Sequence, residues 1–184
     1  MVPILGAGFT RGVNTGRGGK VPSGKELKDA MIEKISLKKK INKSELESEQ
    51  FSSIAEFYQN TFSNPSKDGV IEYYLKNFTR VKINKPQQLR FLNDIKWPYI
   101  YTLNIDTGIE DSKPRGWEVF YPNRKFDKRT INPECRTLYK IHGDVAMFCK
   151  NLDYNEMILT EKPVYCKSSE KRTVPRYIIG RLWK

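Results

Sequence analysis

The chain has 184 residues, of which 38% are hydrophobic and 29% are charged, a balance that fits one globular domain. It contains no apolar stretch of roughly 18 residues and no secretory signal, so we expect a cytoplasmic protein without a membrane anchor. Three widely spaced cysteines without a C-x-x-C pair argue against both a disulfide framework and a zinc knuckle.

The net charge of +12 raises the question of an anionic partner. Nucleic acid or an anionic membrane surface would attract such a chain. Yet the charges are scattered and no nucleic-acid-binding motif frames them, so a solvated basic surface is the simpler interpretation. We expect no membrane partner and keep nucleic acid as a less favoured alternative. The basic clusters span residues 36–43, 123–129 and 168–172.

The first half of the chain predicts one strand followed by helices. Residues 2–5 read as a short buried strand, and a glycine-rich loop follows over residues 6–24. Apolar side chains then recur at helical spacing, and Pro86 suits the first turn of the last helix. Together these helices form a helical insert after the first strand, over about residues 36–95. The predicted helices span residues 25–35, 45–62, 68–78 and 85–95.

The second half changes to short apolar runs typical of strands. A strand, a block of helices and further strands indicate an α/β class, with a Rossmann-like and mainly parallel sheet in a single domain over residues 1–184. The C-terminus predicts the start of a helix over residues 176–183, and the domain is either truncated there or completed by residues 166–184. The predicted strands span residues 99–106, 117–122, 137–144 and 156–160.

Polar residues and glycines follow three of these strands. Residues 6–8 read Gly-Ala-Gly, residues 102–106 contain Asn104 and Asp106, and residues 142–144 read His-Gly-Asp. In open parallel sheets, ligands bind at the carboxyl ends of the strands. We therefore expect the three segments to meet at one edge and to form the functional site.

The glycines of the first segment do not match a dehydrogenase fingerprint. That fingerprint needs a third glycine at position 11, which is Arg11 here, and Gly12 is out of register. Gly6 and Gly8 still let backbone amides approach a pyrophosphate. Thr10 adds a hydroxyl group to the same loop.

The other two segments supply candidate catalytic groups. His142 is the only histidine, and its ordinary pKa of ~6.5 lets it exchange protons near neutral pH. No second histidine or cysteine lies at ligand spacing, so we expect no metal site. Asn104 and Asp106 either cap the following helix or make a turn, or, in the case of Asn104, orient a water molecule or a ribose hydroxyl.

Taken together, the segments "LGAGFTRG…VPSGKEL", "YIYTLNIDTGIED" and "YKIHGD" resemble the sirtuin-like superfamily of NAD-consuming enzymes. The resemblance implies a Rossmann-like fold that holds NAD, with Asn104 and His142 as the catalytic pair beside the nicotinamide ribose. It also implies that the cofactor-binding residues are Gly6, Ala7, Gly8, Thr10, Asp106 and Gly143.

Departures from the sirtuin deacylases point to a zinc-free branch of this superfamily. The chain lacks a four-cysteine zinc module, and Leu103 replaces the glutamine that usually precedes the catalytic asparagine. The zinc-free branch occurs in bacterial antiviral defence proteins and hydrolyses NAD to nicotinamide and ADP-ribose. Its members usually carry sensor or effector domains, so we expect a homo-oligomer, a further domain or a partner protein. An NAD-dependent protein deacylase and a non-catalytic nucleotide- or nucleic-acid-binding module remain the alternatives.

Overall fold

The computed structural model describes residues 2–112, 116–122 and 136–160, which form a parallel sheet and a group of helices. The sheet has the strand order β1-β2-β4-β3, and every neighbouring pair is parallel. This arrangement confirms the predicted α/β, Rossmann-like fold. The strands are β1 (Ile4–Leu5), β2 (Tyr99–Thr102), β3 (Trp117–Phe120) and β4 (Arg136–Lys140).

The two central strands have one fully buried face. Ile100 of β2 pairs with Leu138 of β4, and both side chains have no exposed surface. On the opposite face, Tyr101 stacks on Tyr139 with ring centroids 4.8 Å apart. Successive side chains of a strand point to opposite faces, which explains why the apolar and aromatic positions alternate.

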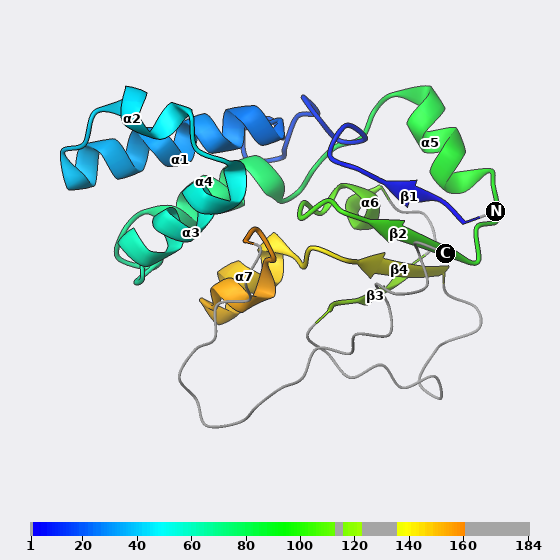
Figure 1. Cartoon of the computed structure of the whole chain (residues 1–184). Coiled ribbons are helices and arrows are strands. Elements are labelled where there is room, and N and C mark those ends of the chain that lie inside the picture. The colour runs from blue at the N-terminus through cyan, green and yellow to red at the C-terminus, as the bar shows by residue number, and fades with distance from the viewer. Residues whose placement is uncertain (1, 113–115, 123–135, 161–184) are drawn as a thin grey trace, which may run out of the picture.

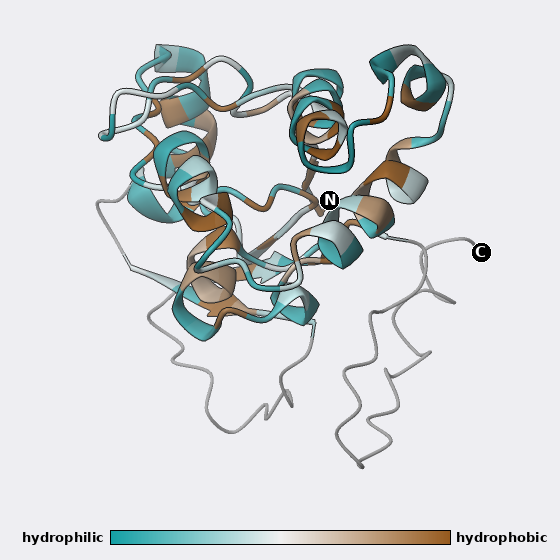
Figure 2. Cartoon of the chain, turned by 90° about the vertical axis from the view of Figure 1, so that its left-hand side faces the viewer, coloured by the Kyte–Doolittle hydropathy of each residue, from teal (hydrophilic) through white to brown (hydrophobic). Residues whose placement is uncertain are grey.

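Most helices lie beyond the carboxyl ends of the strands, at the left of Figure 1. They include the first four helices of the chain and the helix that follows β4, whereas the helix over residues 86–93 lies at the right, near β1. Figure 2 shows that these helices carry hydrophobic and hydrophilic residues on different sides, as expected for helices that pack on one face. The helices are α1 (Gly24–Lys39), α2 (Lys43–Glu47), α3 (Phe51–Thr61), α4 (Val70–Phe78), α5 (Pro86–Asn93), α6 (Gly108–Asp111) and α7 (Val145–Asn151).

The start of α1 is fixed by a capping box. The Ser23 hydroxyl accepts a hydrogen bond from the N–H of Glu26, and the Glu26 carboxylate accepts one from the N–H of Ser23. This exchange satisfies two amides that a helix start leaves free. The helix ends at Lys40, which adopts the left-handed conformation with φ of 56°.

The prediction of one helix over residues 45–62 is wrong, because the segment forms the short helix α2 and the separate helix α3. Leu46 is the only buried residue of α2. The residues between the two helices present no continuous apolar stripe, so a helical conformation there would not be stabilised by packing against the core. The helices predicted over residues 68–78 and 85–95 are confirmed as α4 and α5.

The helical group has its own aromatic core. Tyr74 of α4 meets Phe148 of α7 edge to face, with ring centroids 5.3 Å apart, and both are buried. The buried hydroxyl of Tyr154 donates to the carbonyl of Phe62 at 3.0 Å. These contacts hold α7 against α4, so the segment after β4 is packed against the insert.

The strand predicted over residues 156–160 is also wrong. Residues Tyr154–Glu156 form a 3-10 helix, η2, and Met157 makes only an isolated antiparallel bridge to Gly143. The N–H of Ile158 donates to the carbonyl of His142 at 2.9 Å. This segment therefore braces the loop after β4 and adds no strand to the sheet.

Several sequence predictions fall outside the described residues. They are the basic clusters 123–129 and 168–172, the helix predicted over 176–183, and two of the three cysteines, Cys135 and Cys166. Within the described ranges, no helix is long and apolar enough to cross a membrane.

Candidate functional site

The carboxyl ends of three strands meet at one edge of the sheet. The register pairs Leu5 with Thr102, and Thr102 with Lys140. Directly beyond the strands, the N–H of Leu103 donates to the carbonyl of Leu5 at 2.9 Å, and the N–H of Ile141 donates to that of Thr102 at 2.9 Å. The structure thus brings together the three segments that the sequence singled out, on the side that faces the helical group.

The Gly-Ala-Gly segment forms an exposed turn after β1. The N–H of Phe9 donates to the carbonyl of Gly6 at 2.9 Å, which places Ala7 and Gly8 at the centre of the turn. Their own N–H groups have no acceptor among the described residues. A Cβ atom at Gly6 or Gly8 would meet nothing within 4 Å. No protein neighbour requires glycine at these two positions, and the backbone stays open to a ligand.

Behind this turn, three buried side chains form a hydrogen-bond chain. The Thr10 hydroxyl donates to Asp106 Oδ2 at 2.7 Å and accepts from Asn104 Nδ2 at 2.9 Å. A hydroxyl has one proton to donate, and here the carboxylate takes it. The Asn104 amide must therefore offer its NH₂ group to Thr10, which fixes the orientation of the amide.

The other end of the Asn104 amide is unsatisfied. Its side chain is only 4% exposed, and Oδ1 has no hydrogen-bond partner among the described residues. Buried polar atoms are nearly always hydrogen-bonded, so an unpaired carbonyl oxygen calls for a ligand or a water molecule. The main chain of Asn104 is fixed too, since its N–H donates to the Thr102 hydroxyl at 3.0 Å.

Asp106 anchors this hydrogen-bond chain, and both of its carboxylate oxygens already accept a hydrogen bond from the protein. Oδ2 accepts from Thr10, and Oδ1 accepts from the N–H of Gly108 at the start of α6, at 2.8 Å. Burial raises the pKa of Asp106, although Lys140, Thr10 and Gly108 oppose the shift. Asp106 therefore makes a turn before α6, whose N-cap is Thr107, and its link to a ligand runs through Thr10 and Asn104.

His142 and Gly143 follow β4 at the same edge. The His142 side chain is half-buried, and burial lowers the pKa of its imidazole below the ordinary value of 6.5. The imidazole is consequently neutral at pH 7. Gly143 has a φ of 79°, and a Cβ there would lie 1.9 Å from the carbonyl oxygen of Glu156. The fold itself requires this glycine, in contrast to Gly6 and Gly8.

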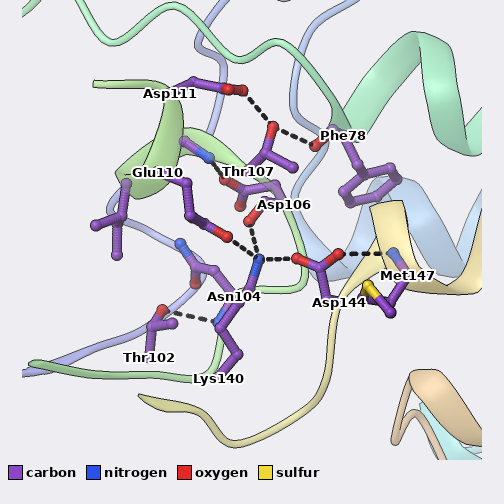
Figure 3. Close-up of polar contacts among 12 residues, drawn as sticks. Phe78, Thr102, Asn104, Asp106, Thr107, Glu110, Asp111, Lys140, Asp144 and Met147 are labelled. Atoms are coloured by element: carbon purple, nitrogen blue, oxygen red, sulfur yellow. Dashed lines mark hydrogen bonds and ion pairs between the residues drawn. The ribbon is translucent and has the colours of Figure 1, made fainter. Parts of the chain in front are cut away.

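A buried lysine links the segments beneath the edge, and the sequence reasoning missed it. The ammonium of Lys140 donates to the carbonyl of Asp106 at 2.6 Å, to Glu110 Oε1 at 2.8 Å and to Asp144 Oδ2 (Figure 3). Burial opposes the charge, but the carboxylates of Glu110, Asp144 and Asp106 outweigh it and raise the pKa of Lys140. The lysine is therefore charged at every ordinary pH.

These four side chains, Lys140, Asp106, Glu110 and Asp144, form what we term the lysine cluster. Asp144 Oδ1 accepts from the N–H of Met147 at 2.8 Å and so caps α7. One ammonium lies among three acidic side chains, and burial raises the pKa of Glu110 despite the lysine. A lysine within an apolar run indicates at most a buried charge, and it does not reveal the partners of that charge.

A scan against protein-family models finds no match for this chain, and a search of curated proteins finds none either. The functional interpretation therefore depends on the residues at this edge and on their geometry.

Proposed function

We propose that this chain hydrolyses NAD at the bond between nicotinamide and ribose, giving nicotinamide and ADP-ribose. The unpaired Oδ1 of buried Asn104 carries the proposal. It belongs to an edge that also holds an open glycine turn and the neutral imidazole of His142. A buried side chain with an unpaired hydrogen-bond acceptor is typical of a ligand site.

The glycine turn supplies the phosphate-binding part of the proposal. The N–H groups of Ala7 and Gly8 are free of protein acceptors among the described residues. Such amides bind phosphate oxygens, and the missing Cβ atoms of Gly6 and Gly8 let a pyrophosphate approach the backbone. The net charge of +12 adds a favourable field for an anionic substrate.

Asn104 and His142 supply the chemistry. When the ribose–nicotinamide bond breaks, its electron pair neutralises the pyridinium nitrogen, so nicotinamide is already a good leaving group. Asn104 Oδ1 accepts a hydrogen bond from the attacking water or from a ribose hydroxyl and so orients it. As the oxygen of water bonds to the ribose carbon, neutral His142 takes up the proton that this oxygen releases.

The lysine cluster would stabilise the positive charge that develops on the ribose during this reaction. Cleavage has oxocarbenium character, so positive charge grows on the ribose. The Lys140 ammonium pairs with Glu110 and Asp144, and the buried side chain of Asp106 adds a third acidic group beneath the edge. Fixed charges aimed at a developing opposite charge stabilise the transition state.

The resemblance to the zinc-free branch extends the proposal to a biological role. We infer that NAD depletion in the bacterial cytoplasm serves antiviral defence. Uncontrolled hydrolysis of NAD would harm the host, so a partner protein, a further domain or self-assembly holds the enzyme inactive until it is needed.

The proposal is tested by measuring nicotinamide release from NAD by the wild-type protein and by Asn104→Ala and His142→Ala. We expect each substitution to lower the rate by about 10²-fold or more, because each removes a group that orients or deprotonates the nucleophile. Lys39→Ala, at an exposed position of α1, is the control and should retain the wild-type rate. Wild-type rates in both site variants would contradict the assignment.

A further inference from the structure

The glycine-rich loop after β1 folds into a small hairpin that follows Thr10 in the chain. Asn14 and Lys20 form an antiparallel bridge, and the N–H of Thr15 donates to the carbonyl of Gly19 at 2.9 Å. A second bridge joins Thr15 to Val81, in the segment after α4. The loop is therefore a built structure that rests on a second part of the chain.

Several contacts fix this hairpin closely. The N–H of Gly16 donates to the carbonyl of Arg80 at 2.7 Å, and the Thr15 hydroxyl donates to that of Lys76 at 2.6 Å. A Cβ atom at Gly19 would lie 2.5 Å from the Lys76 carbonyl oxygen, so only glycine fits there. These contacts fix the distance between the hairpin and residues 76–80.

Five cationic side chains extend from the hairpin, from the last turn of α4 and from the segment after it, and we call them the basic hairpin. All five are exposed, and none forms an ion pair with any of the described residues. A Cβ atom at Gly16 would lie 3.1 Å from Arg80 Cβ and 3.4 Å from Lys82 Cε, so these side chains lie against the loop. The basic hairpin consists of Arg17, Lys20, Lys76, Arg80 and Lys82.

The backbone at Arg80 is strained. Its φ of 53° lies in the left-handed region, which a residue with a Cβ atom rarely adopts. The bond from Gly16 and the bridge at Val81 hold it there. Strain kept in place by several contacts is a common property of functional positions, and here it presents an arginine next to four other cations.

One carboxylate is fixed beside the basic hairpin by neutral donors. Asp111 Oδ2 accepts from the N–H of Val81 at 3.0 Å and from the Thr107 hydroxyl. Among the described residues, none of the five cations is paired with a carboxylate, so their ammonium and guanidinium groups are available to an anionic partner.

We propose that the basic hairpin binds the phosphate backbone of nucleic acid without base preference. Clustered lysines and arginines neutralise successive phosphates and release their counterions. The hairpin carries no exposed aromatic or large aliphatic side chain, so neither base stacking nor insertion into a lipid bilayer supports its binding. This binding does not depend on NAD hydrolysis, because none of the five cations belongs to the candidate NAD site.

The test is fluorescence anisotropy with labelled 20-nucleotide single strands and the matching duplex, titrated at several salt concentrations. The variant Arg17→Gln/Lys82→Gln removes two cations of the basic hairpin, and Lys67→Gln/Lys96→Gln removes two exposed lysines outside the basic clusters. We expect the first variant to bind at least about tenfold more weakly at about 0.1 M salt, and to reduce the slope of log K against log[salt] by about 1.4 to 1.8. The control should change affinity by less than about threefold.

Three outcomes would overturn the proposal: no binding by the wild-type protein, equal losses in both variants, or binding only to phosphatidylserine vesicles. A fourth is a loss of NAD affinity in Arg17→Gln/Lys82→Gln with unchanged oligonucleotide binding, which would assign the cations to the substrate. Thermal melting confirms that both variants fold. Oligonucleotide binding without NAD turnover would support this proposal and contradict the hydrolase proposal, so the two are separable.

Discussion

Thr10 connects the candidate catalytic asparagine to the buried charges beneath it. Its hydroxyl accepts from Asn104 and donates to Asp106, and the residue has no exposed surface. A hydroxyl that donates one hydrogen bond and accepts another in this way holds both neighbouring side chains in one orientation. The direction of the unpaired Asn104 Oδ1 therefore depends on a loop residue 94 positions earlier in the chain.

Replacing this hydroxyl should affect both activity and stability. Thr10→Val keeps the shape but leaves Asn104 Nδ2 and Asp106 Oδ2 without a partner, so we expect a loss of about 1–3 kcal/mol in the free energy of unfolding. Nicotinamide release should fall at least about tenfold, since Asn104 is no longer oriented. Thr10→Ser retains the hydroxyl and is the control for both measurements. Equal activity in the valine and serine variants would contradict this role.

The pH dependence of NAD hydrolysis should report on His142. Burial lowers the pKa of its imidazole below 6.5, and a general base acts in its neutral form. The rate should therefore be constant above this pH and fall as pH decreases through the lowered pKa. A pH-rate profile measures the midpoint, which we expect below 6.5. A midpoint above 6.5, or the same acid limb in His142→Gln, would exclude His142 as the base.

Removal of the buried ammonium should destabilise the fold strongly. Lys140→Met leaves Glu110 and Asp144 without their ion-pair partner, and losing one partner of a buried ion pair costs about 3–5 kcal/mol. Without the lysine, the folded-state pKa values of Asp106 and Glu110 are raised further, because burial remains and the opposing ammonium is gone. The deficit should thus be largest at high pH and shrink as pH falls and the groups become protonated.

Chemical denaturation of Lys140→Met between about pH 8 and about pH 5 checks this prediction. Lys150→Met, at an exposed position near the end of α7, is the control and should change stability little at any pH. A deficit that is independent of pH would indicate that lost packing, and not unpaired charge, causes the effect.

Sequence reasoning at the residue scale found the residues at strand ends but not those beneath them. Asn104 and His142 could be identified because their positions follow two recognisable strand patterns. Lys140 could not, because its partners Glu110 and Asp144 come from α6 and the start of α7, and their approach depends on the tertiary structure. The same holds for the unpaired Asn104 oxygen, since Thr10 decides which end of the amide is free.

At the scale of elements, the loops after β1 and after β4 use glycine for different reasons, and substitutions should separate them. Gly143→Ala places a Cβ 1.9 Å from the Glu156 carbonyl at a positive φ, so we expect a large loss of stability. Gly8→Ala meets no neighbour within 4 Å, so the fold should keep its melting temperature. The proposed approach of a pyrophosphate predicts weaker NAD binding in Gly8→Ala.

Thermal melting and calorimetric titration with NAD measure these two effects. Gly24→Ala, at the start of α1 with open space around the new Cβ, is the control for both. A Gly8→Ala protein with wild-type NAD affinity would show that the turn after β1 does not contact the phosphates.

The elements that could be predicted are those whose pattern is local. The periodicity of α4 and the proline at the start of α5 suffice to find both helices. The segment after α7 has an apolar run like that of a strand, but its backbone bonds to the loop after β4, and no local pattern encodes that partner. The break between α2 and α3 likewise depends on which side chains find a buried contact.

At the scale of the whole molecule, the parallel sheet determines where the candidate site lies. Its register sets the carboxyl ends of β1, β2 and β4 side by side. In the sequence, the helical insert separates β1 from β2, and α6 and β3 separate β2 from β4. The α/β class and the convergence of these ends could be predicted because parallel strands share one direction. The basic hairpin could not, since its two segments come together only when the loop after β1 packs on the residues after α4.

The hydrolase proposal is tested most directly by following the water oxygen into the product. The wild-type protein is incubated with NAD in ¹⁸O-labelled water without any acylated peptide, and the products are analysed by mass spectrometry. We predict equal amounts of nicotinamide and ADP-ribose, with one ¹⁸O atom at the ribose carbon that held nicotinamide, and no products with Asn104→Ala. Intact NAD, or nicotinamide release only when an acylated peptide is added, would contradict the account.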